Sequence, residues 1–168
     1  MRDRSHHQQA KNSSWCRSPG HGPAGRASEQ LIGQYDITPA ITDYLGFGDV
    51  SLAGAPGRSF APLLRGQGAG DWPDAVFFAQ EETRGVRTGR YSYWKLMPGS
   101  GDAVLFDLER DPWQRHDVAG DQTYSDVIVG LDERLTALFA RHSDPRYDVW
   151  RGGRANGSVI RPGVYQAL

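Results

Sequence analysis

Carboxylates cluster in the middle of the chain, where they could support acid–base chemistry or metal binding. They occur at Glu81-Glu82, Asp71 and Asp74. Paired carboxylates do such work when they are buried and converge on one point. These residues fall on predicted turns between strands, where exposed acids are ordinary. A solvated role is therefore favoured over a catalytic one.

Three arginines could bind an anion. Arg84, Arg87 and Arg90 follow one another at intervals of three residues. On a strand this spacing alternates between the two faces, so the arginines do not form a single basic stripe. A guanidinium group at a strand end can still bind sulfate or phosphate through parallel hydrogen bonds. One or two of these arginines therefore remain candidates for an anion contact.

The other residue types that often carry chemistry form no recognisable site. The five histidines show no helical i, i+4 spacing with a glutamate, so a structural or solvated role is favoured for them. The segment GQGAGD, 66–71, lacks a preceding strand, a following helix and the Lys-Ser/Thr that closes a phosphate loop, which favours a flexible loop. Cys16 is the single cysteine and cannot form an internal disulfide or a thiolate cluster.

Composition narrows the class of protein. The 168 residues are 38% hydrophobic, which is enough for one modest core. With a net charge of -1, the chain has no excess of basic residues to form the basic surface that nucleic-acid binding requires, so no nucleic-acid partner is expected. The opening MRDRSHHQQAKNSSW has no apolar segment behind its positive charge, and no later run approaches membrane-spanning length. We expect no signal peptide and no membrane contact; the chain as given is predicted to be soluble and cytoplasmic.

The first half of the chain predicts little regular structure. Residues 1–25 are rich in His, Gln, Ser, Gly and Pro and are expected to be disordered. A short helix is predicted over Ile37–Leu45, with Thr38 as N-cap before Pro39 and Gly46 at the C-terminal end. The Gly- and Pro-rich linker 48–73 follows, with one helical turn around Phe60–Leu64.

The second half predicts an α+β fold. Runs rich in Val, Phe, Tyr and Trp indicate three consecutive strands, Asp74–Gln80, Arg84–Leu96 and Ala103–Leu108. Short connections favour an antiparallel sheet. Apolar residues at steps of three or four over Tyr124–Arg141 predict a helix that covers one face of the sheet and ends at Asp144-Pro145. The tail 144–168 is predicted to be irregular.

Several segments resemble the C-terminal portion of sulfatases of the alkaline phosphatase superfamily. They are GQYDITPAITDYLGF (33–47), PGRSFAPLLRG (56–66), RGVRTGRYSYWKL (84–96) and LFDLERDPWQRHDVAG (105–120). RSPGHGPAGRASEQ, just before them, resembles the end of the catalytic domain. The order and spacing of the segments also agree with that family.

The resemblance implies an organisation and a parent activity. It divides the chain into a leader (1–25), a helix and linker left from the α/β catalytic domain (26–73), the C-terminal subdomain (74–143) and a tail (144–168). Such enzymes hydrolyse sulfate esters with a divalent cation, calcium or a similar ion, and a formylglycine made from a C/S-x-P-x-R motif. CRSPG at Cys16 departs from that motif, so no catalytic or metal residue is carried over. Contact with a sulfate ester is expected only through a missing catalytic domain.

Because the family's C-terminal subdomain borders the active-site cleft, the resemblance makes Glu82 and Arg84 the candidates for substrate contact. On this hypothesis the chain is the C-terminal fragment of a sulfatase-like enzyme and is itself inactive. Its helix and linker should then expose apolar residues that a catalytic body would cover. The alternative is a stand-alone, non-catalytic interaction module that recruits a partner protein through its sheet edge and aromatic hairpin.

Overall fold

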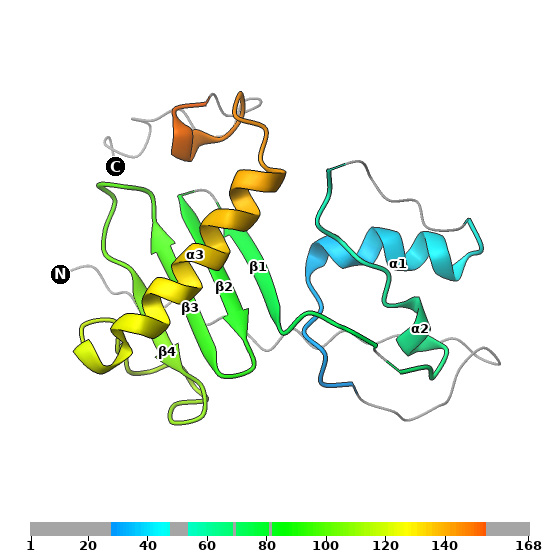
Figure 1. Ribbon diagram of the computed structural model, residues 1–168, viewed down its shortest axis with the longest axis horizontal. Coiled ribbons are helices and arrows are strands. Elements are labelled where there is room, and N and C mark those ends of the chain that lie inside the picture. The colour runs from blue at the N-terminus through cyan, green and yellow to red at the C-terminus, as the bar shows by residue number, and fades with distance from the viewer. Residues whose placement is uncertain (1–27, 48–53, 69, 81, 154–168) are drawn as a thin grey trace, which may run out of the picture.

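The computed structural model describes residues 28–47, 54–68, 70–80 and 82–153. The predicted disorder of 1–25 and part of the linker lie outside these residues. The described elements are η1 (Gln34–Asp36), α1 (Ile37–Tyr44), α2 (Ala61–Leu64), β1 (Ala75–Gln80), β2 (Thr83–Thr88), β3 (Tyr91–Leu96), β4 (Val104–Asp107), η2 (Gln122–Tyr124), α3 (Ser125–His142) and η3 (Val149–Arg151). Figure 1 shows α1 and α2 beside the sheet, on the side of β1.

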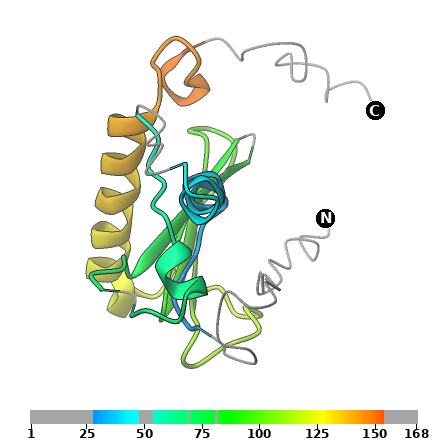
Figure 2. The same ribbon diagram turned by 90° about the vertical axis from the view of Figure 1, so that its right-hand side faces the viewer.

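The four strands form one antiparallel sheet in the order of the chain, β1-β2-β3-β4. Phe77 of β1 lies opposite Val86 of β2, which lies opposite Tyr93 of β3. Helix α3 crosses one face of this sheet, and the edge-on view in Figure 2 shows it on a single side. The predicted α+β class, the antiparallel sheet and the covering helix are therefore confirmed.

The core lies between this face of the sheet and α3. Val86, Tyr93 and Leu105 project from three neighbouring strands, and Leu131 and Leu135 project from the helix. Side chains on one face of a strand recur every second residue, while helical residues four apart share a face. These two periodicities bring the apolar residues together and leave charged residues such as Glu133 and Arg134 on the exposed side of the helix, beside Val129 and small residues.

The sheet has one strand more than the sequence predicted. The run Arg84–Leu96, which is predicted to be a single strand, folds into a hairpin of β2 and β3 around Gly89-Arg90. The Thr88 hydroxyl group accepts a hydrogen bond from the backbone N–H of Tyr91 at 2.9 Å and closes this turn. The segment lacks the Asn-Gly or Asp-Gly pair that usually marks a two-residue hairpin loop, so the turn was missed.

Helix α1 begins one residue before the predicted N-cap. Thr38 lies inside the first turn, and the turn of η1 precedes it. The Asp36 carboxylate accepts hydrogen bonds from the backbone N–H groups of Gly33 and Arg58 at 2.8 and 2.9 Å and so fixes the start. Pro39 is tolerated because the N–H groups of the first helical turn have no helical partner. Gly46 lies at the end of the helix with φ +82°, which confirms its predicted place.

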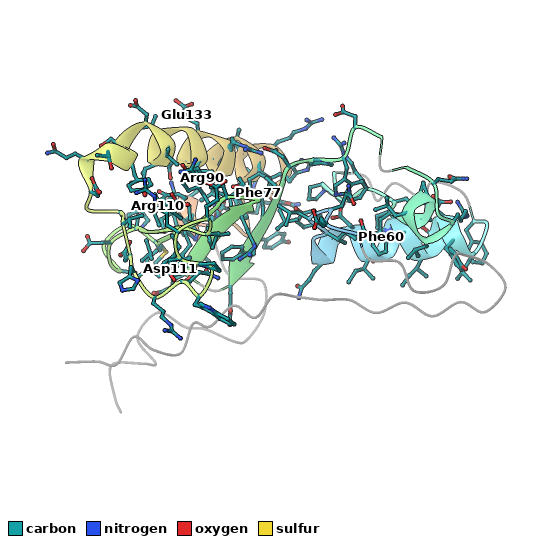
Figure 3. All side chains as sticks on the ribbon, turned by 90° about the horizontal axis from the view of Figure 1, so that it is seen from below. Phe60, Phe77, Arg90, Arg110, Asp111 and Glu133 are labelled. Carbon is teal, nitrogen blue, oxygen red and sulfur yellow. The ribbon has the colours of Figure 1, made fainter. Side chains whose placement is uncertain are left out.

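The N-terminal part is attached to the sheet through Tyr35 and Trp72. The Tyr35 hydroxyl group accepts a hydrogen bond from the N–H of Phe77 at 3.0 Å, and the Trp72 indole N–H donates to the carbonyl oxygen of Leu31 at 2.9 Å. Figure 3 shows Phe77 on the sheet at the side that faces this part, with Phe60 farther out. None of the helices in the described part of the chain has the length and apolar character to cross a membrane.

Candidate functional site

Glu82 lies in the turn between β1 and β2 and is exposed. Its carbonyl oxygen accepts a hydrogen bond from the backbone N–H of Met97 at 2.7 Å, just beyond the end of β3. The turn is therefore tied to the neighbouring strand while the carboxylate faces solvent. An acid held this way can accept hydrogen bonds from a ligand without first breaking an ion pair.

Arg84 points into a tightly packed cluster rather than into solvent. Its side chain is 13% exposed and pairs with the carboxylate of Asp148, which is 0% exposed. Its guanidinium carbon lies 4.1 Å from the ring centroid of Phe139 and 4.8 Å from that of Trp150. The guanidinium group is thus held between two aromatic rings and already neutralised. The structure does not bring it together with Glu82 in one anion-binding pair.

The three arginines singled out in the sequence go to different surroundings. Arg84 pairs with Asp148, while Arg90, in the turn that follows β2, pairs with Asp107 at 3.0 Å. Burial lowers the pKa of Arg87, which lies between them on β2. The arginines therefore form no single basic stripe, as the spacing predicted.

A buried carboxylate that sequence reasoning missed organises the end of β4. Asp107 is 2% exposed and accepts hydrogen bonds from Arg90 at 3.0 Å and from the Tyr124 hydroxyl group at 3.2 Å. Arg110 donates to the same hydroxyl oxygen, and Figure 3 shows Arg90 and Arg110 at the same end of the sheet. The hydrogen bond from Arg90 holds the pKa of Asp107 below its usual value. The available signal was an acid directly after the apolar run VLF.

The Asp-Pro turn has its own internal support. The Asp111 carboxylate accepts hydrogen bonds from the backbone N–H groups of Arg115 and His116, the second at 2.7 Å. Two residues after His116, the N–H of Val118 donates to the carbonyl oxygen of Leu105 at 2.9 Å. The loop thereby covers the free edge of β4. The His116 side chain is 82% exposed, so the residue contributes to the turn through its backbone N–H, within the structural or solvated role that the sequence favoured.

The described residues do not fit a divalent cation. No group of three or more His, Cys, Asp or Glu side chains among them is arranged to hold a metal ion. The buried carboxylates of Asp36, Asp107 and Asp148 each accept hydrogen bonds from N–H donors, and the second oxygen of Asp148, which has no hydrogen-bond partner among the residues that the structure describes, lies 3.7 Å from Arg151. Cys16 lies outside the described residues.

A hollow of about 450 Å³ lies between the β2–β3 turn and the first half of α3. Thr88, Tyr91, Val127 and Leu131 line it, and the ion pair of Arg134 with Asp74 lies at its rim. Of its charged groups, Arg90 pairs with Asp107 and Arg134 with Asp74, and neither Glu82 nor Arg84 lines the hollow. The hollow therefore does not coincide with the predicted substrate contact.

Comparison with known proteins places this architecture among the C-terminal portions of sulfatases. The profile of the family described as "N-sulphoglucosamine sulphohydrolase, C-terminal" matches residues 6–141. The chain is 30% identical over 136 residues to the Delta 4,5-hexuronate-2-O-sulfatase of Bacteroides thetaiotaomicron. The aligned region covers 75% of this chain and 28% of that protein.

Solved structures agree in fold. The phosphonate monoester hydrolase of Agrobacterium radiobacter superimposes with a TM-score of 0.62 at 29% identity, covering 77% of this chain and 29% of that chain. A structure connected with glycosaminoglycan metabolism in Bacteroides thetaiotaomicron superimposes with a TM-score of 0.63 at 23% identity, covering 77% of this chain and 30% of that chain. At that identity the second likeness concerns the fold alone. The chain spans under a third of the length of each of these relatives.

The fold and the matches define the class: a C-terminal portion of a sulfatase-like protein. The chain belongs to the sulfatase family whose C-terminal region the N-sulphoglucosamine sulphohydrolase profile describes.

Proposed function

We propose that this chain serves as the C-terminal part of a hydrolase that cleaves sulfate esters on acidic sugars. In that reaction the S–O bond is broken by water, which releases an alcohol and sulfate. We assign the nucleophile and the divalent cation to a catalytic part outside the described residues. The role proposed for this chain is to complete the catalytic body and to shape the entrance of its cleft.

The observation that carries the proposal is the apolar surface of α1. Ile37, Ile41 and Leu45 recur every four residues and are 42%, 52% and 63% exposed, and Phe47 just beyond them is 72% exposed. The sequence predicted such exposure for both the helix and the linker; the helix has it, whereas Phe60, Leu63 and Leu64 of the described linker are half-buried. Residues four apart form one stripe of a helix, and soluble proteins rarely leave such a stripe open to water. A larger catalytic body is the partner that we propose to cover it.

The β1–β2 hairpin is our proposed substrate-facing element, with Glu82 and Arg84 as its functional residues. Glu82 is exposed at its tip, and Arg84, two residues farther along in β2, is held by Asp148. We propose a sulfated uronic acid as substrate because the relative at 30% identity is a hexuronate-2-O-sulfatase. A phosphonate monoester is the competing substrate, since the Agrobacterium radiobacter hydrolase is 29% identical.

The test is a chimaera. The catalytic part of the Bacteroides thetaiotaomicron sulfatase would be joined to residues 28–153 of this chain, and sulfate release from an unsaturated 2-O-sulfated disaccharide would be measured. The matched control carries Ile41→Glu and Leu45→Glu in the apolar stripe. We expect turnover from the first chimaera and a loss of at least about tenfold from the control, because a charged group at a buried interface costs several kcal/mol. Equal turnover from both would refute docking through α1.

The second candidate, a non-catalytic interaction module, predicts a different result for the isolated chain. Such a module should be monomeric and bind little of a dye that reports exposed apolar surface. Because that module would bind its partner through the sheet edge and the aromatic hairpin, it leaves the exposed stripe on α1 without a task. Sedimentation and dye binding of the purified chain distinguish the two candidates.

A further inference from the structure

The segment 144–153, which we call the C-terminal strap, folds back from the end of α3 as a compact loop. The N–H of Gly153 donates to the carbonyl oxygen of Asp148 at 2.9 Å, and the Asp148 carboxylate accepts from the N–H of Trp150 at 3.0 Å. A Cβ atom at Gly153 would lie 2.6 Å from the carbonyl oxygen of Pro145, so the loop closes too tightly for a side chain there. The strap is therefore a defined piece of structure with Asp148 at its centre.

One side chain of the sheet connects to the strap through both charge and stacking. Arg84 of β2 pairs with Asp148 across 64 positions of the chain. Its guanidinium group lies between Phe139 of α3 and Trp150 of the strap. Three elements thus meet at one cation, two residues from the exposed Glu82.

Electrostatics makes this connection difficult to open. The Asp148 side chain is 0% exposed, and removing the partner of a buried charge is strongly unfavourable. Arg151, 44% exposed and 3.7 Å from the second carboxylate oxygen, is too distant to replace the hydrogen bond of Arg84. The strap and the turn end of the hairpin should therefore move together or not at all.

We propose that Asp148 and Trp150 are positioning residues, which hold Arg84 and thereby fix the orientation of the β1–β2 hairpin and of Glu82 at its tip. This inference rests on the proposed function only in that the hairpin is taken to face the substrate. It gives the strap a task that none of the sequence patterns indicated. It also assigns Arg84 a supporting role, because its charge is already neutralised by Asp148.

Hydrogen exchange on the full chain tests the proposal. Asp148→Asn keeps the size of the side chain and removes its charge. We expect the backbone amides of Gln80 and Thr83, and that of Met97, which donates to the carbonyl oxygen of Glu82, to exchange about tenfold faster, while amides of β3 and β4 keep their rates. The matched control, Asp144→Asn, removes an exposed carboxylate of the strap, which pairs with Arg146, and should leave the hairpin unchanged.

A double substitution separates coupling from a general loss of stability. In an Arg84→Gln background, Asp148→Asn should add less than about twofold to the exchange of the hairpin amides, because the shared interaction is already gone. If Asp148→Asn accelerates the exchange of every amide in the sheet, a second variant is needed. Trp150→Leu keeps the ion pair of Arg84 with Asp148, and faster exchange confined to the hairpin in this variant supports the proposal. The proposal would be overturned if trypsin cleaved the strap of Asp148→Asn faster after Arg146 while the hairpin amides kept their exchange rates. The measurement uses no catalytic part, so an inactive chimaera would leave its result standing.

Discussion

The hydroxyl group of Tyr35 accepts a hydrogen bond from the backbone N–H of Phe77 at 3.0 Å, which joins the turn before α1 to the edge strand of the sheet. Tyr35→Phe removes this acceptor and leaves the N–H of a partly buried residue without a protein partner. We expect a loss of about 1 kcal/mol in the free energy of unfolding, measured by urea denaturation. Tyr147→Phe, at a tyrosine 47% exposed, is the control and should change stability by less than about 0.5 kcal/mol. Equal effects from the two would mean that Tyr35 does not anchor β1.

The ion pair of Arg90 with Asp107 should give the fold an acid-sensitive stability. The hydrogen bond from Arg90 lowers the pKa of Asp107 in the folded state, so the unfolded chain binds more protons as the pH falls. The contribution is complete above the unfolded pKa of about 4 and is lost as the pH falls through the lower, folded pKa.

Asp107→Asn should therefore cost about 2 kcal/mol at pH 7 and flatten the dependence of stability on pH below about pH 4. Denaturation curves between pH 7 and pH 2 give both quantities. Glu109→Gln provides the control, because Glu109 pairs with the same arginine but is 66% exposed. If the free energy of unfolding of Asp107→Asn fell with pH below about pH 4 as steeply as that of the unsubstituted chain, the carboxylate of Asp107 would have the same pKa in the folded and unfolded states.

The features that sequence alone predicted depend on local periodicity. Leu131 and Leu135 recur at helical spacing, and this identified α3 and its buried face. The Gly89-Arg90 turn was missed because its conformation is closed by the hydroxyl group of Thr88 and not by a favoured residue pair. The early start of α1 was missed because Asp36 also binds the N–H of Arg58, 22 positions away.

The candidate site was predictable only where the resemblance supplied it. Glu82 and Arg84 were named together, yet the partner of Arg84 lies in a tail that showed no periodic pattern. Pairing between β2 and Asp148 depends on the path by which the chain returns after α3, and local spacing carries no information on that path. The sequence does not distinguish an exposed acidic residue such as Glu82 from a buried one such as Asp148, because burial depends on partners that are distant along the chain.

Gly57 should be intolerant of any side chain. A Cβ atom there would lie 2.0 Å from the carbonyl oxygen of Tyr35, and backbone atoms cannot yield as the end of a side chain can. Gly57→Ala should displace the neighbouring N–H of Arg58 from Asp36 and cost on the order of 2 kcal/mol in the attachment of α1. Hydrogen exchange should accelerate in α1 but not in β2 or β3. Gly68→Ala, where a Cβ atom meets nothing within 4 Å, is the matched control. Slow exchange throughout α1 in Gly57→Ala would contradict the prediction.

The apolar stripe on α1 should behave as an uncovered interface and not as part of the core of this chain. Ile41 is 52% exposed, so Ile41→Glu should change the free energy of unfolding by less than about 0.5 kcal/mol. The same substitution should reduce self-association in sedimentation, since it breaks an apolar patch that water otherwise contacts. Leu135→Ala, at a residue 0% exposed, should instead cost about 2 to 5 kcal/mol. If Ile41→Glu unfolded the isolated chain as Leu135→Ala does, α1 would have to pack within this chain, and the case for an external catalytic body would lose its main support.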